Sequence, residues 1–434
     1  MTETDPRQTI ETDNMSRFQW SVVAIMVGLL ALDGFDVLSI SFASPGIAAD
    51  WGIDRAALGI VLSMELVGMS FGAIIFGRLA DGLGRRGVIL ACLCIVSFGM
   101  FGASSANGVY PLCAWRVLTG LGLGGVLAAT NAATAEVANG RFRALCIVLM
   151  AAGYPLGNVI GGSVAAQLLA FYDWRAIFQF GAVVSLLFIP VVWFGAPESI
   201  NFLMHKRPPD ALLKINAILA RMKKPAIGAL PPPDAERERP GFKTLLSGSH
   251  LLPTAALTFV YFAHIMTFYF ILKWIPKIVA DMGFAPSSAA TVLVWASVGG
   301  LLGSVTLGLL TLRVRVFWLT VLAMLLSAAA VVWFGQIRSD LAELSMAAAI
   351  AGFVTNAGVV GIYAVVANAF PTEFRASGTG VVIGFGRGGS ALAPALAGFL
   401  FSAGYGLGSV ALLMALGSLM GAVVLTLVVR RIAM

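Results

Sequence analysis

Long apolar segments recur along nearly the whole chain, and they constrain its fold more than any other feature. Each is about 20 residues long or more, enough to cross the ~30 Å hydrocarbon core of a bilayer as a helix. Only helices satisfy the backbone in lipid at this span length. Of the 434 residues 59% are hydrophobic and 11% are charged, too little charge for the surface of a soluble protein. We expect an all-α membrane protein with twelve transmembrane helices, at residues 20–44, 56–77, 87–106, 111–134, 145–171, 176–195, 252–273, 288–310, 316–335, 342–366, 377–403 and 407–429.

Lysine and arginine in the loops predict the orientation. With both termini in the cytoplasm, 21 of these residues fall inside and five fall outside, which agrees with the positive-inside rule. The same asymmetry explains the net charge of +7 without nucleic-acid binding. No cleavage-type site precedes the first span, so we expect a multi-pass protein of the cell inner (cytoplasmic) membrane. The outside set is Arg55, Arg175, Lys273, Lys277 and Arg338.

One long polar stretch divides the chain. We predict a cytoplasmic tail at 1–17, a six-helix bundle at 18–197, a cytoplasmic linker at 198–250 and a second six-helix bundle at 251–434. Within the linker, Asp210 to Met222 is patterned as a short amphipathic helix on the membrane surface.

The two bundles echo each other at a constant offset. Gly308 follows Gly77 by 231 positions, and Gly389 follows Gly157 by 232, as Arg375-Ala376 follows Arg143-Ala144. Repeated halves of the same orientation place a substrate site between them, near the midplane.

Catalytic and metal-binding patterns are missing from the sequence. The four cysteines lie in apolar runs without metal-ligand spacing, and we interpret them as small buried hydrophobes. There is no paired catalytic histidine, zinc-ligand spacing or nucleophile motif. We therefore expect no enzyme, no cofactor and no metal. An intramembrane enzyme or a receptor is the rival of another class, which bound metal or a turnover product would support.

Charged residues inside the predicted spans need a reason, because each costs roughly 2.5–3.5 kcal/mol at mid-bilayer. Helical rise places Asp33 and Asp36 at ~20 and ~24 Å from the inner face, and Arg116 level with them at ~21 Å. Two neighbouring carboxylates do not both ionise cheaply, so we predict that Asp33, Asp36 and Arg116 form a proton-coupling cluster. A static ion pair between the first and fourth helices is the alternative.

Arg387, at ~15 Å depth in the eleventh span, is predicted to bind an anionic substrate, since its fork matches a carboxylate. Its alternative partner is Glu65, at similar depth in the second span. Arg116 is a second candidate contact for the anion. His264 either titrates, hydrogen-bonds a substrate hydroxyl, or is a packing histidine whose ring nitrogens are satisfied within the protein. Six aromatic residues are candidates for the cavity wall, although any one such residue more often faces lipid or the core: Phe35, Tyr154, Phe268, Tyr269, Trp295 and Tyr363.

Two motifs resemble those of the major facilitator superfamily. Gly77-Arg-Leu-Ala-Asp81-Gly-Leu-Gly84-Arg85-Arg86 is similar to its first loop signature, although Gly82 stands where a basic residue is usual. Arg116-x-x-x-Gly120-x-Gly122-x-Gly124-Gly125 resembles its fourth-helix motif. The resemblance implies the major facilitator fold, with Asp81 able to latch basic or helix-terminal partners. We also expect latches between the halves at helix ends, from Glu136, Arg143, Glu373 and Arg375.

Within that superfamily, the chain resembles the aromatic acid–proton symporter family from the first helix to the eleventh. The matching residues are Asp33-Gly-Phe-Asp36, Pro197-Glu-Ser199, Trp274-Ile-Pro276, Phe370-Pro-Thr-Glu-Phe-Arg-Ala-Ser-Gly-Thr-Gly380 and Gly386-Arg-Gly-Gly-Ser390, with Ile200 in place of a usual second proline. In that family the aspartate pair of helix one is associated with transport.

Together these features predict a symporter that imports an aromatic or related unsaturated carboxylate with protons. Its partners are a small aromatic carboxylate, protons and membrane lipid, and we expect a monomer. The alternative is a drug–proton antiporter of the same fold. Its helix-five signature needs a proline where this chain has Asn158, but Pro155 keeps the alternative open. Which acid is carried and with how many protons stays open.

Overall fold

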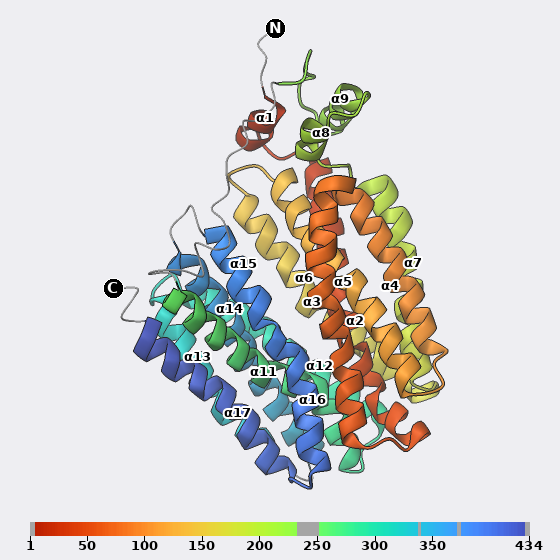
Figure 1. Ribbon diagram of the computed structural model, residues 1–434, viewed down its shortest axis with the longest axis vertical. Coiled ribbons are helices and arrows are strands. Elements are labelled where there is room, and N and C mark those ends of the chain that lie inside the picture. The colour runs from red at the N-terminus through yellow and green to blue at the C-terminus, as the bar shows by residue number, and fades with distance from the viewer. Residues whose placement is uncertain (1–4, 232–250, 337–339, 371–374, 430–434) are drawn as a thin grey trace.

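The computed structural model describes residues 5–231, 251–336, 340–370 and 375–429, without the side chains at 81, 375–377 and 428–429 (Figure 1). Within these ranges twelve helical segments are long and apolar enough to cross a membrane, which confirms the predicted fold class. The first half holds α2 (Arg17–Trp51), α3 (Arg55–Leu83), α4 (Arg85–Ser104), α5 (Val109–Val137), α6 (Arg143–Phe171) and α7 (Arg175–Gly195). The second half holds α11 (Leu251–Asp281), α12 (Pro286–Leu310), α13 (Val316–Phe334), α14 (Leu341–Ala369), α15 (Arg375–Gly386), α16 (Gly388–Ser402), α17 (Leu407–Val424) and the π-helical η2 (Leu425–Val429).

Glycines set the closest helix contacts within each half. Gly157 of α6 packs on the carbonyl of Ala31 in α2, so that no Cβ would fit between the two backbones. Gly389 of α16 packs in the same way on the carbonyl of Phe262 in α11. Phe262 follows Ala31 by 231 positions and Gly389 follows Gly157 by 232. The contact therefore repeats at the offset seen in the sequence, as expected where small residues let membrane helices approach.

Three short helices cover one end of the first half: α1 (Pro6–Thr12), α8 (Ile200–Lys206) and α9 (Ala211–Arg221) (Figure 1). We call this the α1 end. The amphipathic helix expected at Asp210 to Met222 is therefore present as α9. Its buried Ile215, Ile218 and Leu219 join an apolar cluster with residues of α1 and α2, so this face of the helix packs on the protein, and its place at the membrane surface stays a prediction.

The two halves converge at the end opposite α1 and diverge toward the α1 end (Figure 1). At the opposite end Arg55 pairs with Asp281 at 2.8 Å, across the halves. The backbone N–H of Ala56 donates to Ser402 Oγ at 2.8 Å, again across the halves. These contacts close the opposite end.

Candidate functional site

A small cavity lies between the halves, walled by α6 on one side and by α11, α12 and α14 on the other. Its wall is mostly apolar, with Phe268 and Leu272 from α11. Asn356 is a polar wall residue already engaged, because its amide donates to the Gly300 carbonyl and to Ser304 Oγ, each at 2.7 Å. Asn158 differs: its side chain is 3% exposed and its Oδ1 accepts no hydrogen bond from the described residues.

Asp33 and Arg387 belong to opposite halves and lie within electrostatic range of each other. Asp33 lies on α2, and the adjacent Gly34 packs on the Tyr154 carbonyl of the cavity wall. The charged group that acts most strongly on Asp33 is Arg387. Among the described residues Arg387 has no carboxylate within 4 Å, and one oxygen of Asp33 accepts no hydrogen bond. The two opposite charges are thus in electrostatic range without being in contact.

Tyrosine hydroxyls surround Arg387 on its own half. Tyr261, Tyr269 and Tyr363 all act electrostatically on the guanidinium. The hydroxyls of Tyr261 and Tyr363 lie 3.0 Å apart, in a hydrogen bond. The predicted cavity residue Tyr363 is thus near Arg387. Arg387 lies at the junction of α15 and α16, where its backbone stays in the right-handed helical region and its N–H donates to the Ile383 carbonyl at 2.9 Å, so the predicted eleventh span continues through it.

Arg116 has a different partner from the one predicted. It is fully buried, forms an ion pair with Glu65 of α3 and donates to the backbone carbonyl of Asp36 at 3.0 Å. Among the described residues no ion pair joins Arg116 to Asp33 or Asp36, because Glu65 occupies the guanidinium, but Arg116 is one of the charges that act on Asp36, with which it was predicted to cluster. Glu65, the alternative proposed for Arg387, belongs to Arg116 instead. With no exposed surface, Arg116 is not placed to touch a substrate in this structure.

Lys273 was assigned to an outside loop, and this was wrong. Helix α11 continues to Asp281, so Lys273 lies within it and is 0% exposed. Its Nζ lies 3.6 Å from Glu65 Oε2 and donates to the Val37 carbonyl. Trp274 and Pro276, expected after the seventh span, lie within α11 for the same reason. Sequence reasoning missed Lys273 because it stands at the edge of an apolar run.

Three other predicted site residues are held within one half or face outward. Both ring nitrogens of His264 are engaged, with Ser418 Oγ at 2.8 Å and the Thr355 carbonyl at 2.9 Å, which agrees with the packing alternative. Phe35 is buried in the first half against Phe180, with ring centres 5.3 Å apart. Trp295 is 49% exposed on the same stripe of α12 as Leu302 and Leu309. Because that stripe is apolar and points out of the bundle, its predicted place in the cavity wall was wrong.

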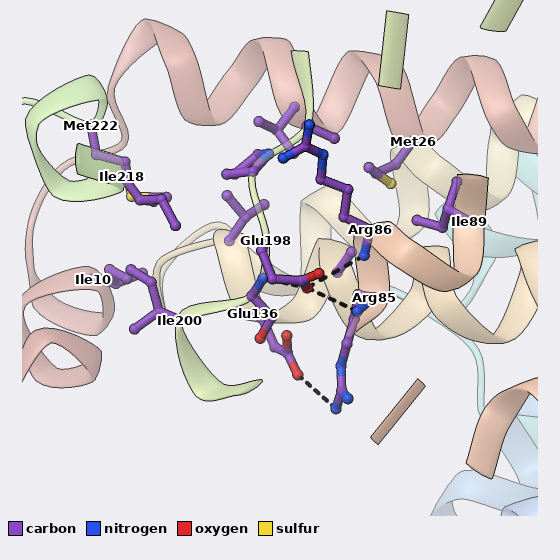
Figure 2. A pocket seen from close by; sticks show the side chains of 16 residues that line it. Ile10, Met26, Arg85, Arg86, Ile89, Glu136, Glu198, Ile200, Ile218 and Met222 are labelled. Atoms are coloured by element: carbon purple, nitrogen blue, oxygen red, sulfur yellow. Dashed lines mark hydrogen bonds and ion pairs between the residues drawn. The ribbon is translucent and has the colours of Figure 1, made fainter. Parts of the chain in front are cut away.

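The loop between α3 and α4 forms a charged cluster at the α1 end. Figure 2 shows the Glu198 carboxylate directed at the start of α4 and the Arg85 guanidinium directed at Glu136. Glu198 Oε1 accepts from the backbone N–H of Arg85 at 2.9 Å and of Arg86 at 3.4 Å. Glycine is needed at Gly84, where φ is +89° and a Cβ would meet Glu198. Glu198 was quoted only as part of a motif, and its capping role was not foreseen.

The expected latches between the halves are otherwise occupied. Arg85 pairs with Glu136 at 3.2 Å, inside the first half. Arg143 pairs with Glu11 of α1, also in the first half. Glu136 and Arg143 therefore do not join the two halves here, contrary to the prediction. Glu373 and the side chains of Asp81 and Arg375 lie outside the described residues, and Gly77 has room for a Cβ, with Ala128 at 3.9 Å.

The comparisons with known proteins agree with this architecture. The family model described as Major Facilitator Superfamily matches residues 25–271 and 257–433. The chain belongs to the Major Facilitator Superfamily. A gallate transporter of Pseudomonas putida is 30% identical to it, over 93% of this chain and 90% of the relative. A 4-hydroxybenzoate transporter, PcaK, of the same species is 32% identical over 89% and 87%. The predicted resemblance to aromatic acid transporters of this superfamily is confirmed.

Solved structures of the same superfamily share the fold. The inward-open xylose transporter XylE of E. coli superposes with a TM-score of 0.74, at 15% identity, over 95% of this chain and 96% of that one. A bacterial homologue of the human lysosomal transporter Spinster, in an inward-facing and occupied conformation, gives 0.74 at 15% identity over 96% and 98%. As the family and these relatives are transporters, the prediction that the chain is not an enzyme is confirmed. Within the described residues, no group of three or more His, Cys, Asp and Glu side chains is placed to hold a metal ion.

Proposed function

We propose that this protein is a proton-coupled symporter that imports an aromatic carboxylate by alternating access. The observation that carries the proposal is the pair Asp33 and Arg387, two opposite charges from opposite halves that lie in electrostatic range without an ion pair. The relatives that carry gallate and 4-hydroxybenzoate support the substrate class. The drug–proton antiporter is not favoured, since Asn158 occupies the proline position of its motif.

The substrate carboxylate would bind Arg387. A guanidinium offers two parallel N–H donors to a carboxylate, and Arg387 has no carboxylate in contact among the described residues. Tyr261, Tyr269 and Tyr363 would flank the bound acid with ring faces and hydroxyls. The ring of the acid would extend toward Phe268 in the cavity wall.

Proton coupling would arise from competition for Arg387. When Asp33 is ionised, its charge neutralises the field of Arg387 and repels an incoming carboxylate. A proton on Asp33 removes that charge and leaves Arg387 to the substrate anion. In the empty site the charge of ionised Asp33 balances that of Arg387. In the loaded site Asp33 is protonated and the substrate monoanion balances Arg387, so the site stays neutral. A neutral site lets the halves rock without exposing an unpaired charge to lipid.

The proposed orientation places the α1 end in the cytoplasm of a bacterial cell, with both termini inside and the protein in the inner membrane. The distribution of lysine and arginine supports it. Placing Lys273 inside α11 removes one cation from the outside set and strengthens that asymmetry. The structure then represents an inward-facing state, closed outside by the contacts of Arg55 and Ser402. We further propose a monomer embedded in lipid that works without a cofactor.

Uptake by liposomes containing purified Asp33→Asn protein tests this function. We expect the variant to lose accumulation of labelled 4-hydroxybenzoate driven by a pH gradient, because its site 33 no longer exchanges a proton. Exchange of labelled for unlabelled acid should persist, since Arg387 stays free to bind. Asp50→Asn is the matched control, in the same helix but ~26 Å away, where Asp50 accepts from Trp174 at 2.8 Å. Unimpaired gradient-driven accumulation by Asp33→Asn would contradict the proposal, and export driven by an inward proton gradient would revive the antiporter.

A further inference from the structure

A lysine of the second half is inserted into the first half. Lys273 of α11 is 0% exposed, and both groups that interact with its ammonium belong to the first half. These are Glu65 of α3, with Oε2 at 3.6 Å from Nζ, and the carbonyl of Val37 in α2. A lysine is almost never fully buried unless it is paired. The position of Lys273 therefore depends on the first half being in place.

Glu65 interacts with two cations, one from its own half and one from the other half. Arg116 is in the same half as Glu65 and also has no exposed surface, so their ion pair moves as one body. Lys273 is in the other half. If the halves separate at the end opposite α1, Glu65 keeps Arg116 and does not become an unpaired buried charge. Lys273 is then freed toward water, where an ammonium is well solvated. The arrangement can thus open and close without leaving an orphaned charge, whose cost would be several kcal/mol per ion.

Lys273 lies deeper than the contacts that close the surface. It precedes Asp281 by eight residues of α11, or ~12 Å of helix. The Arg55–Asp281 pair at the surface has side chains 43% and 26% exposed. Exposed ion pairs contribute little to stability, and water screens them. Lys273 and Glu65 have no exposed surface, so their interaction is not screened in this way.

We propose that Lys273 is the inner latch of the outer gate. It holds the halves together at the end opposite α1 through Glu65 and the Val37 carbonyl, and its release is required for the outward-facing state. Lys273 is a positioning residue in this proposal and does not contact the substrate. The proposal rests on alternating access in the proposed function, but it does not depend on which solute is carried.

Distances between spin labels on the two halves test the latch directly. Ser105, after α4, and Tyr405, between α16 and α17, are both exposed at the end opposite α1. We would label them as cysteines in full-length protein whose four native cysteines are replaced, and measure in liposomes by double electron–electron resonance without substrate. For Lys273→Met we expect the ratio of long to short distances to rise by about tenfold or more, which corresponds to ~1.4 kcal/mol.

Lys277→Met is the matched control. Lys277 is one turn further along α11, and its ammonium pairs with Asp281 in the same half. Its removal should leave the distance distribution unchanged. Glu65→Gln should cause a shift in the same direction, and adding Lys273→Met to it should add little to that shift, because both substitutions remove the Lys273–Glu65 interaction; the ion pair of Glu65 with Arg116, which Glu65→Gln also removes, lies within the first half. If Lys273→Met does not fold, Lys273→Gln takes its place, with a smaller shift expected because the amide still donates to the Val37 carbonyl.

An unchanged distance distribution in folded Lys273→Met or Lys273→Gln protein would overturn the latch, as would an equal shift in Lys277→Met. A variant that loses thermal stability but keeps the wild-type distances would show a merely structural lysine. Since no substrate or proton gradient enters the measurement, these results are independent of the liposome uptake of Asp33→Asn. If the distances shift in Lys273→Met but stay as in the wild type in Asp33→Asn, the result would support the latch even if the proposed solute were wrong.

Discussion

Gly157 offers the sharpest test of the packing that positions the site. A methyl group added there would meet the carbonyl oxygen, carbonyl carbon and Cα of Ala31, all of them backbone atoms. No side-chain rotation relieves this clash, so α2 and α6 must move apart. Overpacking of this kind costs about 1–3 kcal/mol. Since Asp33 is two residues from Ala31 on α2, the displacement also reaches the proposed coupling residue.

The assay is thermal unfolding of detergent-purified Gly157→Ala protein, followed by gradient-driven uptake. For a folding unit of 150–250 residues, 1 kcal/mol corresponds to about 2–4 °C in Tm. We therefore expect Tm to fall by about 2–12 °C and the rate of uptake to fall with it. Gly308→Ala is the matched control, because Gly308 is also helical, in α12, but has no atom within 4 Å of an added Cβ. Alanine stabilises a helix by about 0.5–1 kcal/mol relative to glycine, so Tm of Gly308→Ala should stay the same or rise.

The two glycines should thus respond with opposite signs to the same chemical change. A Gly157→Ala protein as stable as the wild type would refute the backbone contact between α2 and α6. Equal losses at Gly157 and Gly308 would show a general intolerance of alanine at helical glycines, and the close-approach argument would fail.

Two further predictions separate packing residues from those of the proposed site. His264→Leu removes both hydrogen bonds of the ring and takes away a partner of the Ser418 hydroxyl and of the Thr355 carbonyl, so stability should fall by about 1–3 kcal/mol in thermal unfolding. The pH profile of uptake should stay unchanged, and a shifted profile would return His264 to the coupling machinery. Asn158 Oδ1 is a buried acceptor in the cavity wall that could receive the ring hydroxyl of 4-hydroxybenzoate, a group that benzoate lacks. Asn158→Ala removes this acceptor, so competition assays should show the preference for 4-hydroxybenzoate over benzoate fall by up to about tenfold. An unchanged ratio of the two affinities would show that Asn158 does not accept from the ring hydroxyl.

The transmembrane topology could be predicted because it depends on local properties. A run of about 20 apolar residues forms a spanning helix whatever its neighbours, since lipid leaves the backbone no other way to satisfy its hydrogen bonds. Helix ends were less predictable. Lys273 marks the point where charge reappears in the sequence, yet α11 continues to Asp281, because Glu65 and the Val37 carbonyl compensate the ammonium inside the bundle.

The depth of buried charges was predictable, but not their partners. Helical rise placed Asp33, Asp36 and Arg116 at one level, and Arg116 does reach the backbone of Asp36. The rotation of each helix about its axis decides which side chains meet at that level. That rotation is set by contacts such as Gly157 on Ala31, which join residues far apart in the chain.

A membrane protein of two repeated six-helix halves, with carboxylates and arginines buried near the midplane, could be predicted from the linear sequence. These conclusions follow from apolar length, loop charge and motif spacing, which a linear chain carries directly. The partners of the buried charges could be read only from the folded chain: Arg116 pairs with Glu65, Asp33 and Arg387 come into electrostatic range from opposite halves, and Lys273 bridges the halves. The physical reason is that a buried charge takes the nearest compensating group in space, and helix packing alone determines which group that is.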